Sequence, residues 1–375
     1  MTCKSFLVSF LLIISVADLS AQRLPSKKKI LKPLRLSNQY FMNKWPDAGK
    51  PIVTNATRPS NIWTRGVYYE GLMALYNIDK KQSYYDYAVQ WGEKHKWGLR
   101  NGIQTRSADD QDCGQTYIDL YLIDKNPERI HDIKASVDLM VKSEKSDDWW
   151  WIDALQMAMP VFTKLGVVYN DTSYFRKMYD LYSNTKYKQG GMGLYNPKDG
   201  LWWRDKSFLP PYKEPNGKDC YWSRGNGWVV AALARTLSLL PKNDPHYNEY
   251  LQDYKDICAA LIPLQREDGF WNVSLHDSTH FGGKETSGTA LFTYGFAWGI
   301  NNHILDKKTY KRVVAKAWKA MVKDAVHPDG MLGYVQGTGK EPKDGQPVGY
   351  DNIPDFEDYG LGAFLLAGSE VYKMK

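Results

Sequence analysis

The chain has 375 residues, 43% of them hydrophobic, with 14 Trp, 26 Tyr and a formal net charge of +7. This modest basic surplus, without a cluster of Lys and Arg, excludes nucleic acid as the expected partner and is compatible with an anionic substrate. No apolar stretch after residue 21 is long enough to predict a membrane span. The cysteines after that point are odd in number and have no CxxC spacing, which excludes a disulfide framework and a zinc site; they are Cys113, Cys220 and Cys258.

Residues 1–21 have the pattern of a secretory signal peptide. Lys4 is followed by the apolar run Phe6–Val16 and then by Leu19-Ser20-Ala21, a short small-residue end typical of a cleavage site. We therefore expect an exported protein, periplasmic or secreted, whose residues 22–375 form a single catalytic domain. Many Trp-rich exported proteins stack aromatic side chains on sugar rings, although large helical folds also use aromatic residues as packing.

Six segments rich in aromatic and small residues recur along the chain and predict buried helices. They are Arg65–Ile78, Gln115–Ile123, Trp151–Gly166, Gly225–Pro241, Ser287–Asn302 and Glu357–Met374. Each is apolar nearly all round, which is typical of an inner layer. Their starts lie 50, 36, 74, 62 and 70 residues apart, a spacing that indicates repeated helical hairpins.

A more polar helical stretch accompanies each of the six segments, with charged residues on one face and apolar residues at helical spacing on the other. These stretches are Leu31–Trp45, Ser83–Trp97, Glu128–Ser143, Thr172–Lys186, His246–Gln265 and Lys308–Val326. Twelve helices in six pairs predict an all-α fold, an (α/α)6 barrel of six helical hairpins. In such a barrel the loops that enter the inner helices converge at one end, so polar residues at the starts of those helices are the candidates for a pocket.

Three acids, Asp109, Asp110 and Asp112, precede the second inner helix. Capping that helix requires one of them, so a second role is expected for at least one of the others. The residues alone do not distinguish among the three. This segment predicts a functional carboxylate without identifying it.

Asp153 lies just inside an apolar run that follows the consecutive tryptophans Trp149, Trp150 and Trp151. Three consecutive side chains on a helix cannot all face a core, so at least one is expected to line a cavity or an interface. An ionised carboxylate in an apolar run is costly, and a raised pKa suits general acid–base catalysis near neutral pH. The alternative interpretation is that the Asp only caps the helix.

The segment Trp222–Trp228 opens the fourth inner helix with the sequence WSRGNGW. Arg224 offers a planar fork for a carboxylate, and Trp222 and Trp228 offer a stacking surface. Trp203 lies in an Asp-Gly turn, for which a structural role is the first interpretation and a contact with a ligand the second. The same segments can also be read as structural turns. Neither a metal-ligand spacing on a predicted helix nor a nucleotide-binding motif is present, so no metal and no cofactor are expected.

These motifs resemble glycoside hydrolase family 105, the unsaturated rhamnogalacturonyl hydrolases, and the related unsaturated glucuronyl hydrolases of family 88. The resemblance covers essentially the whole mature chain and rests on Trp151–Met157, on Trp222–Trp228 and on the acidic stretch that ends at Gly114. It implies an (α/α)6 barrel that needs no metal and that releases a 4,5-unsaturated uronic acid from the non-reducing end of lyase-generated oligosaccharides.

The resemblance also implies roles for individual residues. Asp153 would protonate C4 of the C4=C5 vinyl ether and activate the water that adds at C5. Asp109 is the first choice for the assisting carboxylate, with Asp110 and Asp112 close behind. Arg224 and Trp228 fall where the family binds the unsaturated sugar. The full set of candidate substrate-binding residues is Asp110, Asp112, Trp150, Trp203, Trp222, Arg224 and Trp228. Histidines that family members place near the acid are missing here, which leaves the parent polysaccharide open.

Two other classes of function remain open on the same barrel. One is a polysaccharide lyase or an inverting glycosidase, because a fold does not determine a reaction. The other is a sugar-binding protein without catalysis, in which Asp153 would be dispensable. The sequence also leaves open the linkage, the tolerance of sulfate, the chain-length preference and the oligomeric state.

Overall fold

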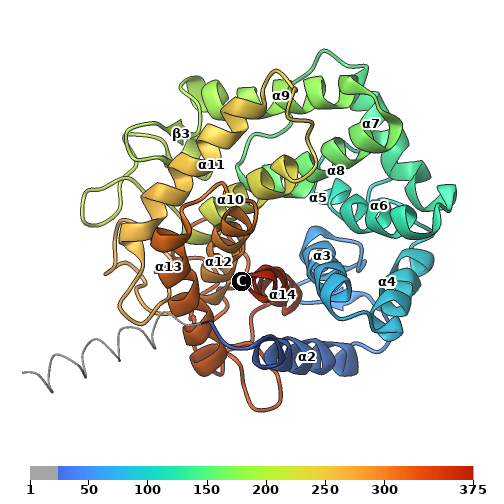
Figure 1. Ribbon diagram of the computed structural model, residues 1–375. Helices are drawn as coiled ribbons and strands as arrows, with labels where there is room; N and C mark the ends of the chain where they lie inside the picture. Colours follow the sequence, from blue (N-terminus) through green and yellow to red (C-terminus); the bar gives the residue numbers. More distant parts are fainter. Residues whose placement is uncertain (1–23, 375) are drawn as a thin grey trace, which may run out of the picture.

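The computed structural model describes residues 24–374, which fold into two concentric rings of helices (Figure 1). The inner ring consists of α3 (Trp63–Ile78), α6 (Cys113–Asp124), α8 (Asp153–Tyr169), α10 (Ser223–Leu237), α12 (Thr286–Asn301) and α14 (Asp358–Lys373). Each inner helix packs against the next, and α14 returns to α3 and closes the ring. The predicted (α/α)6 barrel is thereby confirmed. The predicted signal peptide lies outside the described residues.

The outer ring contains the more polar helices. They are α2 (Lys27–Lys44), α4 (Gln82–Lys94), α7 (His131–Val141), α9 (Thr172–Tyr187), α11 (Tyr247–Leu261) and α13 (Lys307–Ala320). The helix predicted over Lys308–Val326 ends earlier, at Ala320, and continues as one π-helical turn, Met321–Ala325. In α13 the buried stripe includes Val313, Val314 and Ala317, as the helical spacing predicts.

Short elements fill the loops between the helices. They are the four-residue helix α5 (Ala108–Gln111), the 3-10 turns η1 (Pro127–Ile130), η2 (Gln189–Gly191), η3 (Lys206–Phe208) and η4 (Ile262–Leu264), and the strand pairs β1 (Ile52–Val53) with β2 (Thr57–Arg58) and β3 (Tyr195–Asn196) with β4 (Leu201–Trp202). Three Asp-Gly turns recur among them. Their glycines, Gly200, Gly269 and Gly330, have φ values of 66°, 97° and 104°, which favour glycine over other residues.

The inner helices approach closely because glycines lie at their contacts. A Cβ atom on Gly71 of α3 would lie 2.4 Å from the carbonyl oxygen of Gly362 in α14, so these two helices touch backbone to backbone. At the start of the same two helices, Arg65 Nε donates to Asp358 Oδ2 at 3.1 Å, and both side chains are buried. The six inner helices run in the same direction, so their N-terminal ends gather at one end of the barrel.

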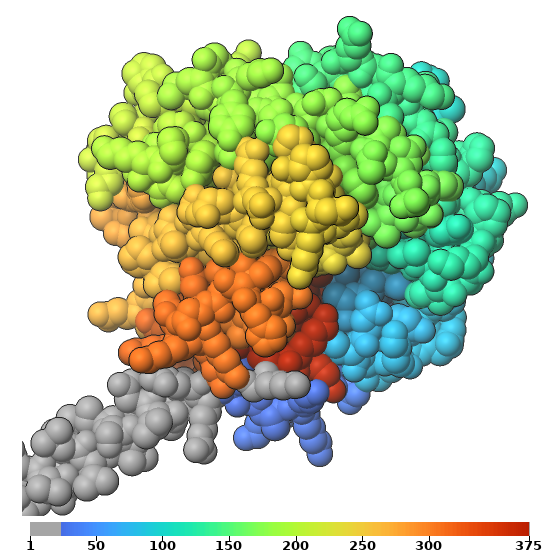
Figure 2. Space-filling model, turned by 45° about the horizontal axis from the view of Figure 1, so that its top comes forward, coloured from blue at the N-terminus to red at the C-terminus, as the bar shows by residue number. Residues whose placement is uncertain are grey.

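Figure 2 shows the molecule from an oblique angle, with α14 in red exposed between the orange surface of α13 and the light-blue surface of the first hairpins.

Cys113, Cys220 and Cys258 are buried free thiols. A search of the helices in the described part of the chain finds none that is long and apolar enough to cross a membrane.

Candidate active site

Asp153 is the first residue of α8, and the chain before it places an arginine beside it. Trp151 pairs with Asp205 in an antiparallel bridge. The N–H of Ile152 donates to the carbonyl oxygen of Arg204 at 3.0 Å. The Nε of Arg204 then donates to Asp153 Oδ2 at 3.0 Å, and its Nη1 donates to Asp205 Oδ2 at 2.8 Å. Asp153 is 8% exposed, and its Oδ1 is buried without a hydrogen-bond partner in the described part of the chain.

Asp109 lies on the short helix α5 and is electrostatically coupled to Asp153. Burial raises the pKa of Asp109 to about 7, and the negative charge of Asp153 adds to this rise. Burial also raises the pKa of Asp153, while Arg204 and Arg224 oppose the rise. Because the negative charge of Asp153 disfavours the ionisation of Asp109, this site retains a proton near neutral pH.

The other two acids of the same segment have different surroundings. Asp110 is buried and accepts hydrogen bonds from Asn101 Nδ2 and Thr105 Oγ1, each at 2.7 Å, so it holds the loop before α5. Asp112 is fully buried beneath the mouth of the barrel, where Gln115 Nε2 donates to its Oδ1 at 3.2 Å. Of the three predicted candidates, only Asp109 lines the cavity at this end, and the geometry therefore favours it as the second carboxylate.

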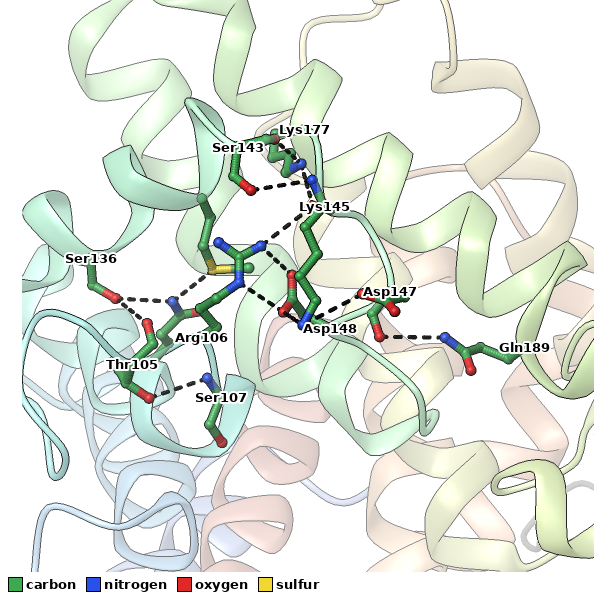
Figure 3. A network of polar contacts seen from close by, with 12 residues as sticks. Thr105, Arg106, Ser107, Ser136, Ser143, Lys145, Asp147, Asp148, Lys177 and Gln189 are labelled. Carbon is green, nitrogen blue, oxygen red and sulfur yellow. Dashed lines mark hydrogen bonds and ion pairs between the residues drawn. The ribbon is translucent and has the colours of Figure 1, made fainter.

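A cavity of about 390 Å³ opens beside Asp109 and Arg204. Its wall is formed by Arg106, Ser107, Asp109, Lys145, Asp147, Asp148, Trp150, Trp151 and Arg204. One side of it is an ionic network: Arg106 Nε donates to Asp148 Oδ1 at 2.8 Å, and Lys145 Nζ lies 3.1 Å from the same oxygen (Figure 3). The wall therefore offers both donors and acceptors, a mixture that suits the hydroxyl groups of a sugar.

The three consecutive tryptophans divide between core and cavity, as predicted. Trp149 is fully buried against Phe162, and Trp151 is buried at the bridge before α8. Trp150 is 50% exposed, and the guanidinium carbon of Arg204 lies 5.7 Å from its ring centroid. Trp150 therefore presents an open aromatic face at the cavity.

A buried lysine of the outer ring fixes the loop that carries this wall. Lys177 on α9 is 4% exposed, and its Nζ donates to the carbonyl oxygens of Ser143 at 2.6 Å and Lys145 at 2.5 Å (Figure 3). Arg106 Nη2 donates to the same carbonyl oxygen of Lys145 at 3.4 Å. The loop is thus held from both sides before any ligand binds.

The remaining predicted binding residues lie in the packed wall at the barrel mouth. Arg224 is buried, and its Nη1 and Nη2 donate to the carbonyl oxygens of Gln336 at 2.8 Å and Gly337 at 2.7 Å. Trp222 Nε1 donates to Gln336 Oε1 at 2.8 Å. Trp228 is buried with its edge towards the half-buried Trp63, and Trp203 is buried against Tyr221. A direct contact of these four side chains with substrate stays a prediction.

A larger cavity of about 790 Å³ lies at the opposite end of the barrel, where α12 and α14 end. Its acids are already bound: Glu370 accepts from Asn301 at 2.8 Å and from Lys373 at 2.6 Å, and Asp306 caps α13. Asp109, which lines the smaller cavity, has a pKa raised to about 7 by burial and by the neighbouring charge of Asp153. We therefore assign the chemistry to the smaller cavity.

Sequence reasoning did not select the cations of this site. Arg204 lies 51 residues from Asp153, and Arg106 lies 42 residues from Asp148. Only the Trp151–Asp205 bridge brings Arg204 to the acid. Both arginines could have been found from their position in the sequence, because each lies beside a segment predicted to form the site. Arg204 directly follows Trp203, and Arg106 precedes the three acids Asp109, Asp110 and Asp112.

Comparison with known proteins finds relatives that match most of the chain. An unsaturated 3S-rhamnoglycuronyl hydrolase from Formosa agariphila is 34% identical over 353 residues, covering 88% of this chain and 89% of that protein. The structure of a glycosyl hydrolase family 88 protein from Bacteroides vulgatus superposes with a TM-score of 0.84 at 32% identity, covering 93% of this chain and 100% of that one. A structure described as a polysaccharide lyase superposes with a TM-score of 0.83 at 32% identity, covering 93% of this chain and 98% of that one.

The family assignment rests on the length of the match. Residues 34–375 match the profile of Glycosyl Hydrolase Family 88, which covers the barrel except for the first residues of α2. This match confirms the resemblance drawn from the motifs around Asp153 and Arg224. The chain therefore belongs to glycosyl hydrolase family 88 and is a glycoside hydrolase of the unsaturated uronyl hydrolase type.

Proposed function

We propose that this hydrolase releases a 4,5-unsaturated uronic acid that is linked to rhamnose at the non-reducing end of lyase-generated oligosaccharides. The observation that carries the proposal is the coupled pair Asp153 and Asp109, one of them bound by Arg204, at the edge of a cavity with an open tryptophan face. The rhamnose is supported by the name of the Formosa agariphila relative.

The proposed reaction uses the proton that the pair retains. A carboxyl of the pair, with Asp153 as the assigned acid, gives its proton to C4, and positive charge develops at C5 and the ring oxygen. Water adds at C5 and returns a proton to the carboxylate. The resulting hemiketal opens to a ketone at C5, and the hemiacetal left at C1 collapses to an aldehyde and expels the aglycone alcohol. The acid is regenerated, so the reaction consumes only water.

Activity is expected to fall as the pH rises through about 7. The pair must hold a proton to begin the reaction, and burial together with Asp153 raises the pKa of Asp109 to about 7. Because the active form is the protonated one, kcat/KM is expected to be constant below this pH and to fall about tenfold per pH unit above it. A pH profile of kcat/KM between pH 5 and 9 measures this, and a profile that is flat to pH 9 would contradict it.

The function is tested with lyase-generated disaccharides from ulvan, pectin and glycosaminoglycans. The conjugated enol ether absorbs ultraviolet light, and its hydration removes that absorbance. We expect loss of absorbance with the rhamnose-containing substrate. No loss with any of the three substrates would overturn the proposal.

Trp150→Ala is expected to raise KM about tenfold with little loss of folding stability, since stacking of a ligand ring on an open aromatic face contributes about 1–3 kcal/mol. Trp150 is 50% exposed, so its removal leaves no cavity in the core. Tyr169→Ala is a matched control, because Tyr169 is 43% exposed at the far end of the same helix, α8. Steady-state kinetics of both variants check this, and an equal effect of the two would contradict a role in binding.

A polysaccharide lyase is the second candidate, favoured by the lyase description of the structure that is 32% identical. A lyase acting on the intact polymer creates the ultraviolet absorbance that a hydrolase removes. The same assay, started from intact polymer, therefore distinguishes the two reactions by the sign of the change.

We also propose that the chain is exported, on the basis of the pattern in residues 1–21. Fractionation of expressing cells and sequencing of the mature N-terminus test this. A protein that begins at Met1 inside the cytoplasm would contradict it.

A further inference from the structure

Glu70 is an acid of the inner helix α3 that the proposed reaction does not use. It is 1% exposed. Gln156 Nε2 donates to its Oε2 at 2.8 Å, and Arg235 Nη2 lies 3.5 Å from the same oxygen. Its second oxygen, Oε1, has no donor in the described part of the chain. A buried carboxylate oxygen without a donor is costly and calls for a partner.

The partner is the carboxyl of Asp112. The two side chains lie within hydrogen-bonding range of each other, and Asp112 Oδ2 also lacks a donor in the described residues. Gly66, one helical turn before Glu70, makes room for that oxygen: a Cβ there would lie 2.0 Å from Asp112 Oδ2. Because two carboxylate oxygens are both acceptors, they form a hydrogen bond only when a proton lies between them.

The charges of the surrounding cluster require the same proton. Three carboxyls, Glu70, Asp112 and Asp119, meet two cations, Arg235 and Lys164. One shared proton leaves two negative and two positive charges, whereas full ionisation leaves an uncompensated charge in the core. Burial raises the pKa of Asp112 well above its usual range, and Glu70 adds to the rise. The other titratable groups that face the pair are Asp109, Cys113 and, beyond Arg235, Tyr294 and Glu370.

Two of the three neighbours of Glu70, Asp112 and Gln156, lie one helical turn from a catalytic candidate. Asp112 follows Asp109 by three residues with helical backbone angles, φ −55° and ψ −42°. Gln156 follows Asp153 by three residues within α8. Glu70 therefore joins α5 and α8 directly beneath the two acids that those helices carry.

We propose that Glu70 and Asp112 share one proton, and that Glu70 is a positioning residue that sets the separation of Asp109 and Asp153. The catalytic part of this inference rests on the proposed function, which assigns the reaction to those two acids. The shared proton itself does not depend on it.

The shared proton is tested without substrate, through the pH dependence of folding. The wild-type folded state holds a proton that the unfolded chain releases above about pH 5, whereas in Glu70→Gln the amide donates to an ionised Asp112 and no proton is held. We expect the ratio of wild-type to variant unfolding constants to rise about tenfold per pH unit from pH 5.5 to 7.5, measured by denaturant titration. Glu370→Gln, which removes a buried carboxylate already bound by two donors, is the control and should run parallel to wild type. A ratio for Glu70→Gln that does not change with pH overturns the shared proton.

The positioning role is tested by comparing Glu70→Gln with Glu70→Leu. The amide of Glu70→Gln keeps the hydrogen bonds to Gln156 and Asp112 and is expected to retain kcat within about threefold. Leucine breaks both bonds and is expected to lower kcat about 30-fold or more, with a smaller change in KM. The reason is that misplacement of a catalytic group by about 1 Å costs up to about 100-fold in rate. A carboxyl NMR titration gives a readout without substrate: in Glu70→Leu the pKa of Asp109 should fall from about 7 as Asp153 moves away, and in Glu70→Gln it should not. Equal effects of the two variants, or none from leucine, overturn the positioning role. If Glu70→Leu does not fold, Asp112→Leu, which breaks the same contact from the other side, takes its place in the NMR titration.

Discussion

Asp153→Asn is expected to lower kcat by about 10²–10⁴-fold, the range that a positioned general acid–base group contributes. Asparagine accepts the hydrogen bond that Arg204 now gives to Asp153 Oδ2 at 3.0 Å, so the site keeps its shape. An amide has no acidic proton for C4 and cannot take a proton from water. KM is therefore expected to change much less than kcat.

Folding stability provides the internal check on this variant. Burial raises the pKa of Asp153, so the ionised carboxylate is disfavoured there and a neutral amide is tolerated without loss of stability. Asp253→Asn is a matched control, since Asp253 is a buried acid that binds Lys186 Nζ at 2.6 Å between α9 and α11, away from the cavity. The control should keep kcat, because Asp253 lies away from the cavity. An Asp153→Asn enzyme with more than a tenth of the wild-type kcat would contradict the assignment of the acid.

Arg65→Met is expected to destabilise the fold by about 3–5 kcal/mol, because it leaves the buried Asp358 without its cation. The two side chains are each 2% exposed, and Arg65 Nε lies 3.1 Å from Asp358 Oδ2. Arg35→Met is the control: its bond to Asp79 is at 2.6 Å, but Arg35 is 46% exposed, and such a surface pair contributes at most about 1 kcal/mol. Urea denaturation measures both losses, and equal losses would contradict the argument from burial.

The deficit of Arg65→Met should also depend on pH. Burial already raises the pKa of Asp358, and Arg65 opposes that rise. Without the arginine the folded-state pKa rises further, so the variant folds with a bound proton and loses stability as the pH rises above about 4, where the unfolded Asp releases its proton. Adding Asp358→Asn should recover part of the loss at pH 8 and less of it at pH 5.

The helices were predictable because their patterns are local. The twelve segments differ in how completely apolar residues surround the helix axis, and this difference alone separated the inner ring from the outer one. The burial of Asp153 was predictable for the same reason, since it follows from the apolar residues on either side of it. The exposure of Trp150 followed from the geometry of three consecutive side chains.

The partners of these residues were not predictable from the chain, because they depend on contacts between distant segments. Arg204 reaches Asp153 only through a bridge that joins loops about 50 residues apart. The distinction between Asp109, Asp110 and Asp112 depends on which of them meets Asn101, which meets Glu70 and which faces the cavity. Arg224 shows the same limit, since its terminal nitrogens donate to the backbone carbonyls of two distant residues, partners that no local pattern indicates.

The backbone contact between α3 and α14 has a consequence during synthesis. Arg65 and Asp358 are 293 residues apart, so the last of the inner helices emerges from the ribosome long after the helix it must touch (Figure 1). Until then the nascent chain is an open arc in which the facing sides of α3 and α12 lack their neighbour. Such long-range closure is slow, and it leaves apolar surface exposed until α14 takes its place in the ring.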